Sequence, residues 1–267
     1  STLFPYTTLF RSERWAAAEA ARRERRLRVA HAYEWPLPSH APAALHPMIL
    51  REAAARIGAK KVRTAVAAAT KAAPGLMVET ELVQGTAIPM LRKISEQACL
   101  LVLGSRGLGG FAGLLAGSVA VALAAHGHCP VVVVRGETPD RDAPVIVGVD
   151  GSAASEPAVA LAFDEAAIRG CGLLAVQASP PVEGAAEALA ERLAGWQEKY
   201  PEVAVTRVVE HSRPARALLH AARDHDAQLI VVGGRGRGGL TGLALGSVSQ
   251  AMIHHAPCPV LIARTGG

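Results

Sequence analysis

Short apolar runs alternate with longer stretches of helical periodicity along most of the chain. In the second half, apolar β-branched runs predict buried strands, and residues at helical spacing predict the helices between them. The predicted strands are 144–150, 172–178, 203–209, 228–233 and 259–264, and the predicted helices are 152–169, 182–200, 213–223 and 247–255. Strands that alternate with helices predict a doubly wound parallel sheet with right-handed crossovers.

The first half repeats this order. Its predicted strands are 27–32, 76–83, 100–104 and 130–135, and its predicted helices are 46–73, 87–97 and 118–125. The run 100–135 aligns without a gap with the run 229–264, and equivalent positions such as Gly104 and Gly233 are 129 residues apart. A repeat of this kind predicts two copies of one α/β domain with a five-stranded sheet, 1–138 and 144–267, of which the first is truncated at its first strand. The polar stretch 136–143 suits a linker.

The composition indicates a globular protein but does not indicate a function. Half of the 267 residues are hydrophobic, only 4% are aromatic, and the net charge is +5. Part of that charge is a run of arginines at 22–28, which fits either a nucleic-acid patch or a solvated helix end. We favour the helix end, and expect no nucleic-acid partner, because no aromatic residues are interleaved with the arginines.

The four cysteines and the apolar runs indicate the cellular compartment in which we expect the protein. The cysteines form no CxxC pair, no apolar run approaches the length of a membrane span, and the N-terminus lacks the pattern of a signal peptide. We therefore expect a cytoplasmic protein with no membrane contact.

A glycine-rich loop in each copy carries the strongest chemical signal. The second copy reads Gly233-x2-Gly236-x9-Gly246-Ser247, and the first reads Gly104-x2-Gly107-x9-Gly117-Ser118. Glycine lets a phosphate chain approach the backbone N–H groups, since a Cβ would hold it off. The serine lies where the last helix begins, so its hydroxyl and the free N–H groups of the first turn favour an anion there.

Other polar residues complete this candidate site in the second copy. Asp150 ends the first predicted strand and offers an acceptor for an adenine amino group or a ribose hydroxyl. Arg235 and Arg237 add positive charge beside the loop. In a doubly wound sheet, ligands bind beyond the carboxyl ends of the strands, which is where these residues are predicted to lie.

This loop, the segment Val149 to Ser152 and the Cys-Pro-Val before each last strand resemble the ATP-binding branch of the universal stress protein family. The resemblance covers the chain from about Arg14 onward, twice. It implies a Rossmann-like fold of the adenine nucleotide α-hydrolase type and an ATP ligand, with or without Mg²⁺. The implied contacts of the second copy are Asp150, Ala178, Gly233, Arg235, Gly236, Gly246, Ser247 and Val248, and those of the first are Ala32, Gly104, Gly107, Gly117 and Ser118.

Two competing motifs are weaker. The string Gly234-x-Gly236-x-x-Gly239 fits a dinucleotide fingerprint, but no acidic residue follows Asp226 to hold a ribose. A histidine and a cysteine recur three residues apart after the last helix of each copy. Because a metal site needs three or four converging ligands, we expect no metal there.

The predicted function is an ATP-binding regulatory or stress-survival module. We expect no catalytic residue, and ATP hydrolysis that is slow at most, because the loop supplies donors and Asp150 is the only nearby carboxylate. The alternatives are a nucleotide-independent interaction scaffold and a weak adenine-nucleotide hydrolase.

The N-terminus and the last strands carry two further expectations. Residues 1–12 contain no acidic residue or glycine where the repeat calls for a first strand, and they look non-native. We therefore expect them to be poorly ordered and the first copy to lack a tight ATP site. The apolar strands 130–135 and 259–264 resemble the edges by which family members pair, so we expect them to pair within the chain, with a homodimer as a further option.

Overall fold

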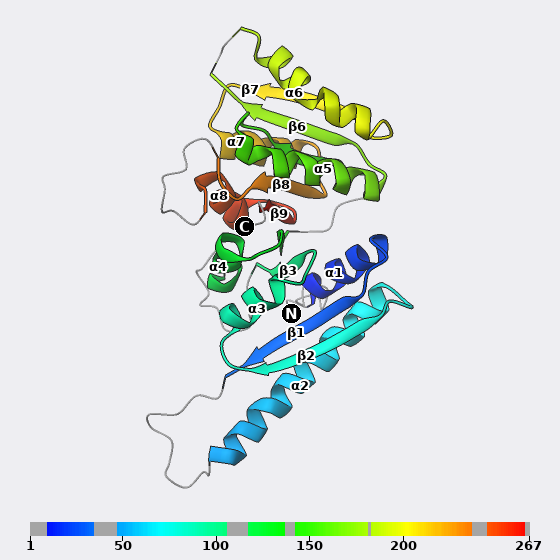
Figure 1. Ribbon diagram of the computed structural model, residues 1–267, viewed down its shortest axis with the longest axis vertical. Helices are drawn as coiled ribbons and strands as arrows, with labels where there is room; N and C mark the ends of the chain where they lie inside the picture. The colour runs from blue at the N-terminus through cyan, green and yellow to red at the C-terminus, as the bar shows by residue number, and fades with distance from the viewer. Residues whose placement is uncertain are drawn as a thin grey trace, which may run out of the picture. The chain divides into compact units, whose positions relative to one another are not determined.

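The computed structural model describes residues 10–34, 47–105, 117–136, 142–180, 183–236 and 245–264. The chain divides into two compact units, residues 1–97 and 98–267. Figure 1 shows that helices and strands alternate along the chain. The fold is therefore of the predicted α/β, Rossmann-like class.

The first unit contains a small parallel sheet of two described strands. Its elements are α1 (Arg11–Arg22), β1 (Leu27–Tyr33), α2 (Pro47–Ala72), β2 (Val78–Gln84) and α3 (Ala87–Ser95). Strand β1 pairs with β2 from Leu27 opposite Val78 onward. Small side chains, among them the buried Ala17 and Ala69, let α1 and α2 approach closely.

The second unit is larger and contains strands from both copies. Its elements are β3 (Leu101–Gly104), α4 (Ser118–His126), β4 (Val131–Val134), β5 (Val145–Gly148), the short 3₁₀ turn η2 (Ala153–Ser155), α5 (Glu156–Arg169), β6 (Leu173–Ala178), α6 (Ala185–Lys199), β7 (Val205–Glu210), α7 (Pro214–Asp224), β8 (Leu229–Gly233), α8 (Ser247–His255) and β9 (Val260–Ala263). Within the described residues, its strands form one sheet in the order β3-β4-β9-β8-β5-β6-β7.

The second copy has all five predicted strands. They are parallel, and β5 lies in the centre between β6 and β8. Right-handed crossovers place α5 and α6 on one face of the sheet and α7 and α8 on the other. The first pair is joined by Phe163 and Trp196, whose ring centroids are 6.0 Å apart. Strands β6 and β7 lie on one side of β5, and β8 and β9 on the other, so the carboxyl ends of β5 and β8 form the switch point where a ligand is expected.

The pairing expected between the two last strands is confirmed. Strand β4 runs antiparallel to β9, with Val131 opposite Ile262 and Val133 opposite Val260. These four side chains are fully buried. Burying a valine or isoleucine side chain contributes about 1.5–3 kcal/mol relative to leaving it exposed, so this contact is a substantial part of the core.

The four described strands of the first copy belong to two sheets. In the second copy β5 pairs with both β6 and β8, whose counterparts in the first copy are β1 and β3. Among the described residues, β1 pairs with β2 alone and β3 with β4 alone. The described residues contain no counterpart of β5 that joins these two pairs, which is why the four strands belong to two sheets.

The N-terminal expectation falls mostly outside the described residues. Residues 1–9 are not described, whereas Arg11 and Ser12 form the start of α1. The arginines that follow α1 have acidic partners in the same unit. Arg23 pairs with the buried Glu19, and Arg26 pairs with Glu79. Only Arg22 and Arg23 of this run lie at the end of α1, whereas Arg28 is part of β1.

Gly136, directly after β4, provides a test of the contact between the copies. Its φ is +63°, and a Cβ built there would lie 1.5 Å from the carbonyl oxygen of Pro257. Gly170 has nearly the same φ, +65°, but open space around it. We expect Gly170→Ala to cost about 1 kcal/mol of unfolding free energy for its left-handed backbone alone. Gly136→Ala should cost at least about 2 kcal/mol more, because the backbone at Pro257 has to move.

Urea denaturation of the two variants measures this difference. Equal losses for Gly136→Ala and Gly170→Ala would show that β4 is not packed against the Pro257 turn.

The cysteine that precedes β9 makes stability depend on alkaline pH. Burial raises the pKa of the Cys258 thiol from 9.0 to about 12. The unfolded chain therefore loses this proton first, and the stabilisation is complete below pH 9 and lost as the pH rises toward the folded value. We expect this thiol to lower the unfolding free energy by up to about 1.4 kcal/mol per pH unit above pH 9.

The check is to measure unfolding free energy against pH for the wild type and Cys258→Ala. The variant should be less stable at pH 7 but should show a shallower decline above pH 9. Parallel curves would contradict the burial of this thiol.

Candidate functional site

Asp150 is fixed where the central strand of the second copy ends. It lies two residues after the end of β5, and its Oδ1 accepts hydrogen bonds from the backbone N–H of Ser152 at 2.9 Å and from the Ser152 hydroxyl at 2.6 Å. This is the local turn that aspartate and serine favour after a strand. The carboxylate is therefore held at the carboxyl edge of the sheet.

The loop after β8 approaches Asp150 from the neighbouring strand. A Cβ built at Gly236 would lie 2.8 Å from Asp150 Oδ2, closer than such contacts occur in proteins. Glycine at this position thus has a specific physical reason, since any side chain would displace either the loop or the carboxylate. The glycine spacing predicts phosphate approach at Gly236, and the structure adds its approach to Asp150.

Helix α8 begins beside the same loop. Its N-cap residue is Gly246, and no side chain caps the helix. The N–H of Gly246 donates to the carbonyl of Gly234 at 2.9 Å, which closes the loop. Because the first N–H groups of a helix have no intrahelical partner, the turn formed by Ser247 and Val248 presents donors and a positive dipole end.

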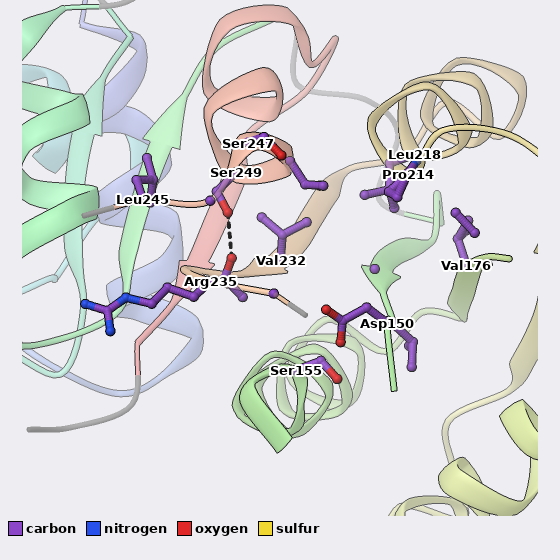
Figure 2. A pocket seen from close by; sticks show the side chains of 17 residues that line it. Asp150, Ser155, Val176, Pro214, Leu218, Val232, Arg235, Leu245, Ser247 and Ser249 are labelled. Carbon is purple, nitrogen blue, oxygen red and sulfur yellow. Dashed lines mark hydrogen bonds between the residues drawn. The ribbon is translucent and has the colours of Figure 1, made fainter. Parts of the chain in front are cut away.

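These parts surround one cavity of about 390 Å³. All eight predicted residues of the second copy line it: Asp150, Ala178, Gly233, Arg235, Gly236, Gly246, Ser247 and Val248. Figure 2 shows Asp150 on one side of the cavity and the start of α8, with Ser247 and Ser249, on another. This volume lies in the range of small-molecule sites, which begins at about 300 Å³.

The remaining wall is largely apolar and was not predicted from the sequence. Val176 comes from β6, Val232 from β8, and Pro214 and Leu218 from the first turns of α7. The two residues of α7 are four positions apart, so they lie on one face of the helix. That spacing is the sequence signal that identifies them, but it is equally typical of an ordinary core face. An apolar wall opposite a carboxylate and a helix N-terminus suits a flat heterocycle that carries an anionic group.

The two predicted basic residues have different outcomes. Arg235 borders the cavity, but its side chain is exposed, and Figure 2 shows its guanidinium pointing away from Asp150 and the apolar wall. Arg237 lies outside the described residues. Among the described residues that line the cavity, Asp150 is the only carboxylate.

The first copy keeps one half of this arrangement. The N–H of Gly117 donates to the carbonyl of Ser105 at 2.8 Å, as Gly246 does to Gly234, and Gly117 begins α4 without a side-chain cap. Gly104 ends β3, Ser118 is the first residue of α4, and Gly107 lies outside the described residues. Ala32, the counterpart of Ala178, lies in β1 and therefore in the other unit.

Sequence reasoning missed Ser249. Its side chain is 2% exposed, and its hydroxyl donates to the carbonyl of Gly233 at 2.6 Å, which ties the first turn of α8 to the end of β8 (Figure 2). The equivalent residue of the first copy is Ala120. No serine side chain caps α5, because the Ser152 side chain turns to Asp150 and neither Ser152 nor Ser155 makes a side-chain cap.

Ser249 offers a test of how α8 is held. We expect Ser249→Ala to lower the unfolding free energy by about 1–2 kcal/mol, because the buried carbonyl of Gly233 loses its donor. Ser247→Ala is the matched control on the same helix, since Ser247 is exposed, and it should change stability by less than about 0.5 kcal/mol. Chemical denaturation of both variants measures the difference, and equal effects would refute this account of the helix.

Two other kinds of feature, a metal cluster and a membrane-spanning helix, are absent from the described residues. No group of three or more histidine, cysteine, aspartate or glutamate side chains there is arranged to hold a metal ion. No helix among them is long and apolar enough to cross a membrane.

Comparison with known proteins places the chain in a family. The model of the universal stress protein family matches residues 11–135 and again residues 143–264. A crystal structure of a universal stress protein from Archaeoglobus fulgidus superposes with a TM-score of 0.71, covers 99% of this chain and 94% of its own, and is 21% identical. That structure supports the fold.

Curated relatives cover both copies. A universal stress protein of Mycobacterium tuberculosis is 40% identical over 272 residues, which span 94% of this chain and 91% of that protein. One of Mycobacterium bovis is 49% identical over 207 residues, 71% of this chain and 70% of its own length. Since the family model matches twice in sequence, this chain belongs to the universal stress protein family and contains two copies of its domain.

Proposed function

We propose that the second copy binds ATP in the cavity between the ends of β5, β6 and β8 and the start of α8. The observation that carries the proposal is the meeting of three unlike surfaces around one cavity: the carboxylate of Asp150, the apolar wall and the uncapped N-terminus of α8. Adenine suits the apolar wall, a ribose hydroxyl suits a carboxylate acceptor, and phosphates suit a helix N-terminus.

Each part of ATP has a proposed contact in the cavity. Adenine would lie against Val176 and Ala178, and a ribose hydroxyl would donate to the carboxylate of Asp150. The phosphates would receive bonds from the N–H groups of Ser247 and Val248. Gly233 and Gly236 would leave room for the chain between ribose and phosphates.

Mg²⁺ would reach this site with the nucleotide. With Asp150 the only carboxylate among the described lining residues, the protein offers few ligands of its own, and Mg²⁺ commonly keeps waters and substrate phosphate oxygens as ligands. The same scarcity leaves no second acid to position a water for attack on a phosphate. We therefore propose binding as the activity, in a regulatory or stress-survival module that responds to ATP.

A thermal-shift titration tests the proposal. At a ligand concentration of about 100 times Kd, ATP should stabilise the wild type by about 2.7 kcal/mol. Ala178→Leu should abolish this stabilisation, because the larger side chain occupies the adenine wall. The matched control is Ala32→Leu at the equivalent position of the first copy, which should leave the ATP response unchanged.

The thermal shift of the wild type with ATP decides first whether the protein binds ATP. No shift with millimolar ATP in the wild type would refute ATP binding. If Ala32→Leu removes the thermal shift and Ala178→Leu retains it, ATP binds to the first copy and not to the second, which would contradict the proposal.

A further inference from the structure

Two arginines exchange contacts between the copies beside the β4–β9 pair. Arg135 follows β4 in the first copy, and its guanidinium donates to the carbonyl of Ile253 in α8 of the second copy. Arg264 follows β9 in the second copy and donates to the carbonyl of Ala124 in α4 at 3.0 Å, and also to that of Ala125. The donors and acceptors occupy equivalent positions of the repeat, so the two contacts mirror each other.

Each arginine completes the end of a helix that belongs to the other copy. The carbonyl of Ile253 is one of the last four of α8, which have no donor within the helix. The carbonyl of Met252, the neighbouring residue, receives the N–H of Ala256 at 3.0 Å. A guanidinium at a helix C-terminus both supplies donors and complements the negative end of the dipole.

Helix α8 is thus held at both ends by different parts of the chain. At its start, the hydroxyl of Ser249 donates to Gly233 of the same copy, and at its end Arg135 reaches in from the other copy. The two anchored residues, Ser249 and Ile253, are four positions apart, so about 6 Å of helix separates them. The first turn of α8, which lines the cavity, therefore depends for its position on a residue outside the second copy.

Two histidines, His254 and His255, lie in the last turn of α8, close to Arg135. Burial, together with the nearby charges of His255 and Arg135, lowers the pKa of His254. His254 is therefore neutral at pH 7 and does not place a second positive charge next to the guanidinium.

We propose that Arg135 of the first copy is a positioning residue for the phosphate-binding turn of the second copy. The proposal rests on the proposed function, because it concerns the same cavity. It makes the contact between the copies a condition for tight binding of the phosphates, whereas adenine and ribose meet residues of β5 and β6. The mirrored Arg264 has no such role, because it acts on α4.

Arg135→Ala and Arg264→Ala form a matched pair for the test. Hydrogen exchange of the full chain without nucleotide reports on the hydrogen-bonded amides of α8 from Gln250 onward. In Arg135→Ala these amides should exchange about tenfold faster, the effect expected from losing one charged hydrogen bond, and in Arg264→Ala they should not change. Arg135→Lys keeps the charge and should restore most of the protection.

Calorimetry with ATP and with adenosine supplies the second readout. Arg135→Ala should weaken ATP binding about five- to tenfold but change adenosine binding less than twofold, because only ATP has phosphates for the turn of α8. A general loss of structure would weaken both ligands together. Arg264→Ala should bind both ligands as the wild type does, and Arg135→Lys should recover most of the ATP affinity.

The remaining outcomes separate the two proposals. A wild type that binds neither ligand refutes the proposed function, and with it the role of Arg135 in nucleotide binding. A wild type that binds ATP refutes the inference alone if α8 exchange is unchanged in Arg135→Ala, if ATP and adenosine weaken equally, or if Arg264→Ala has the same effects.

Discussion

The antiparallel contact between β4 and β9 joins strands of both copies into one sheet. Its residues are among the most buried of the chain, and it is formed by short apolar strands that would otherwise be open edges. The arginines that follow the two strands then reach the ends of α8 and α4 in opposite copies. The position of the helix that borders the cavity is in this way linked to the contact between the repeats.

The same contact explains why the compact units do not follow the repeat. Strands β3 and β4 of the first copy belong to the unit that contains the second copy, since β4 pairs with β9 there. Strands β1 and β2 form their own sheet in the described residues, without a counterpart of the central strand β5. We propose that the sequence repeats have the boundaries 1–138 and 144–267. The compact units, 1–97 and 98–267, have different boundaries.

Local sequence patterns predict most of the strands and helices, but they do not predict which apolar side chains line the cavity or where Arg235 points. Alternation of apolar runs and helical spacing predicted all five strands of the second copy. Four of them, β5, β6, β8 and β9, form nearly continuous apolar runs because they are largely buried on both faces, whereas β7 is an edge strand with exposed residues. The glycine spacing predicted residues that gather around the cavity, since Gly233 ends β8, Gly246 begins α8 and Gly236 lies in the loop between them. Val232 and Leu218 could not be distinguished from ordinary core residues, because lining a cavity and filling a core require the same side chains. The direction of Arg235 depends on its rotamer, and no pattern in the sequence encodes it.

The central claim is that one copy, the second, holds the nucleotide. Native mass spectrometry of the intact chain with increasing ATP counts bound ligands directly. The account predicts one ATP per chain at concentrations that saturate the second copy, because only there do Asp150, the apolar wall and the start of α8 meet in one described cavity. Two equivalent ATP molecules per chain, or none at millimolar ATP, would contradict it.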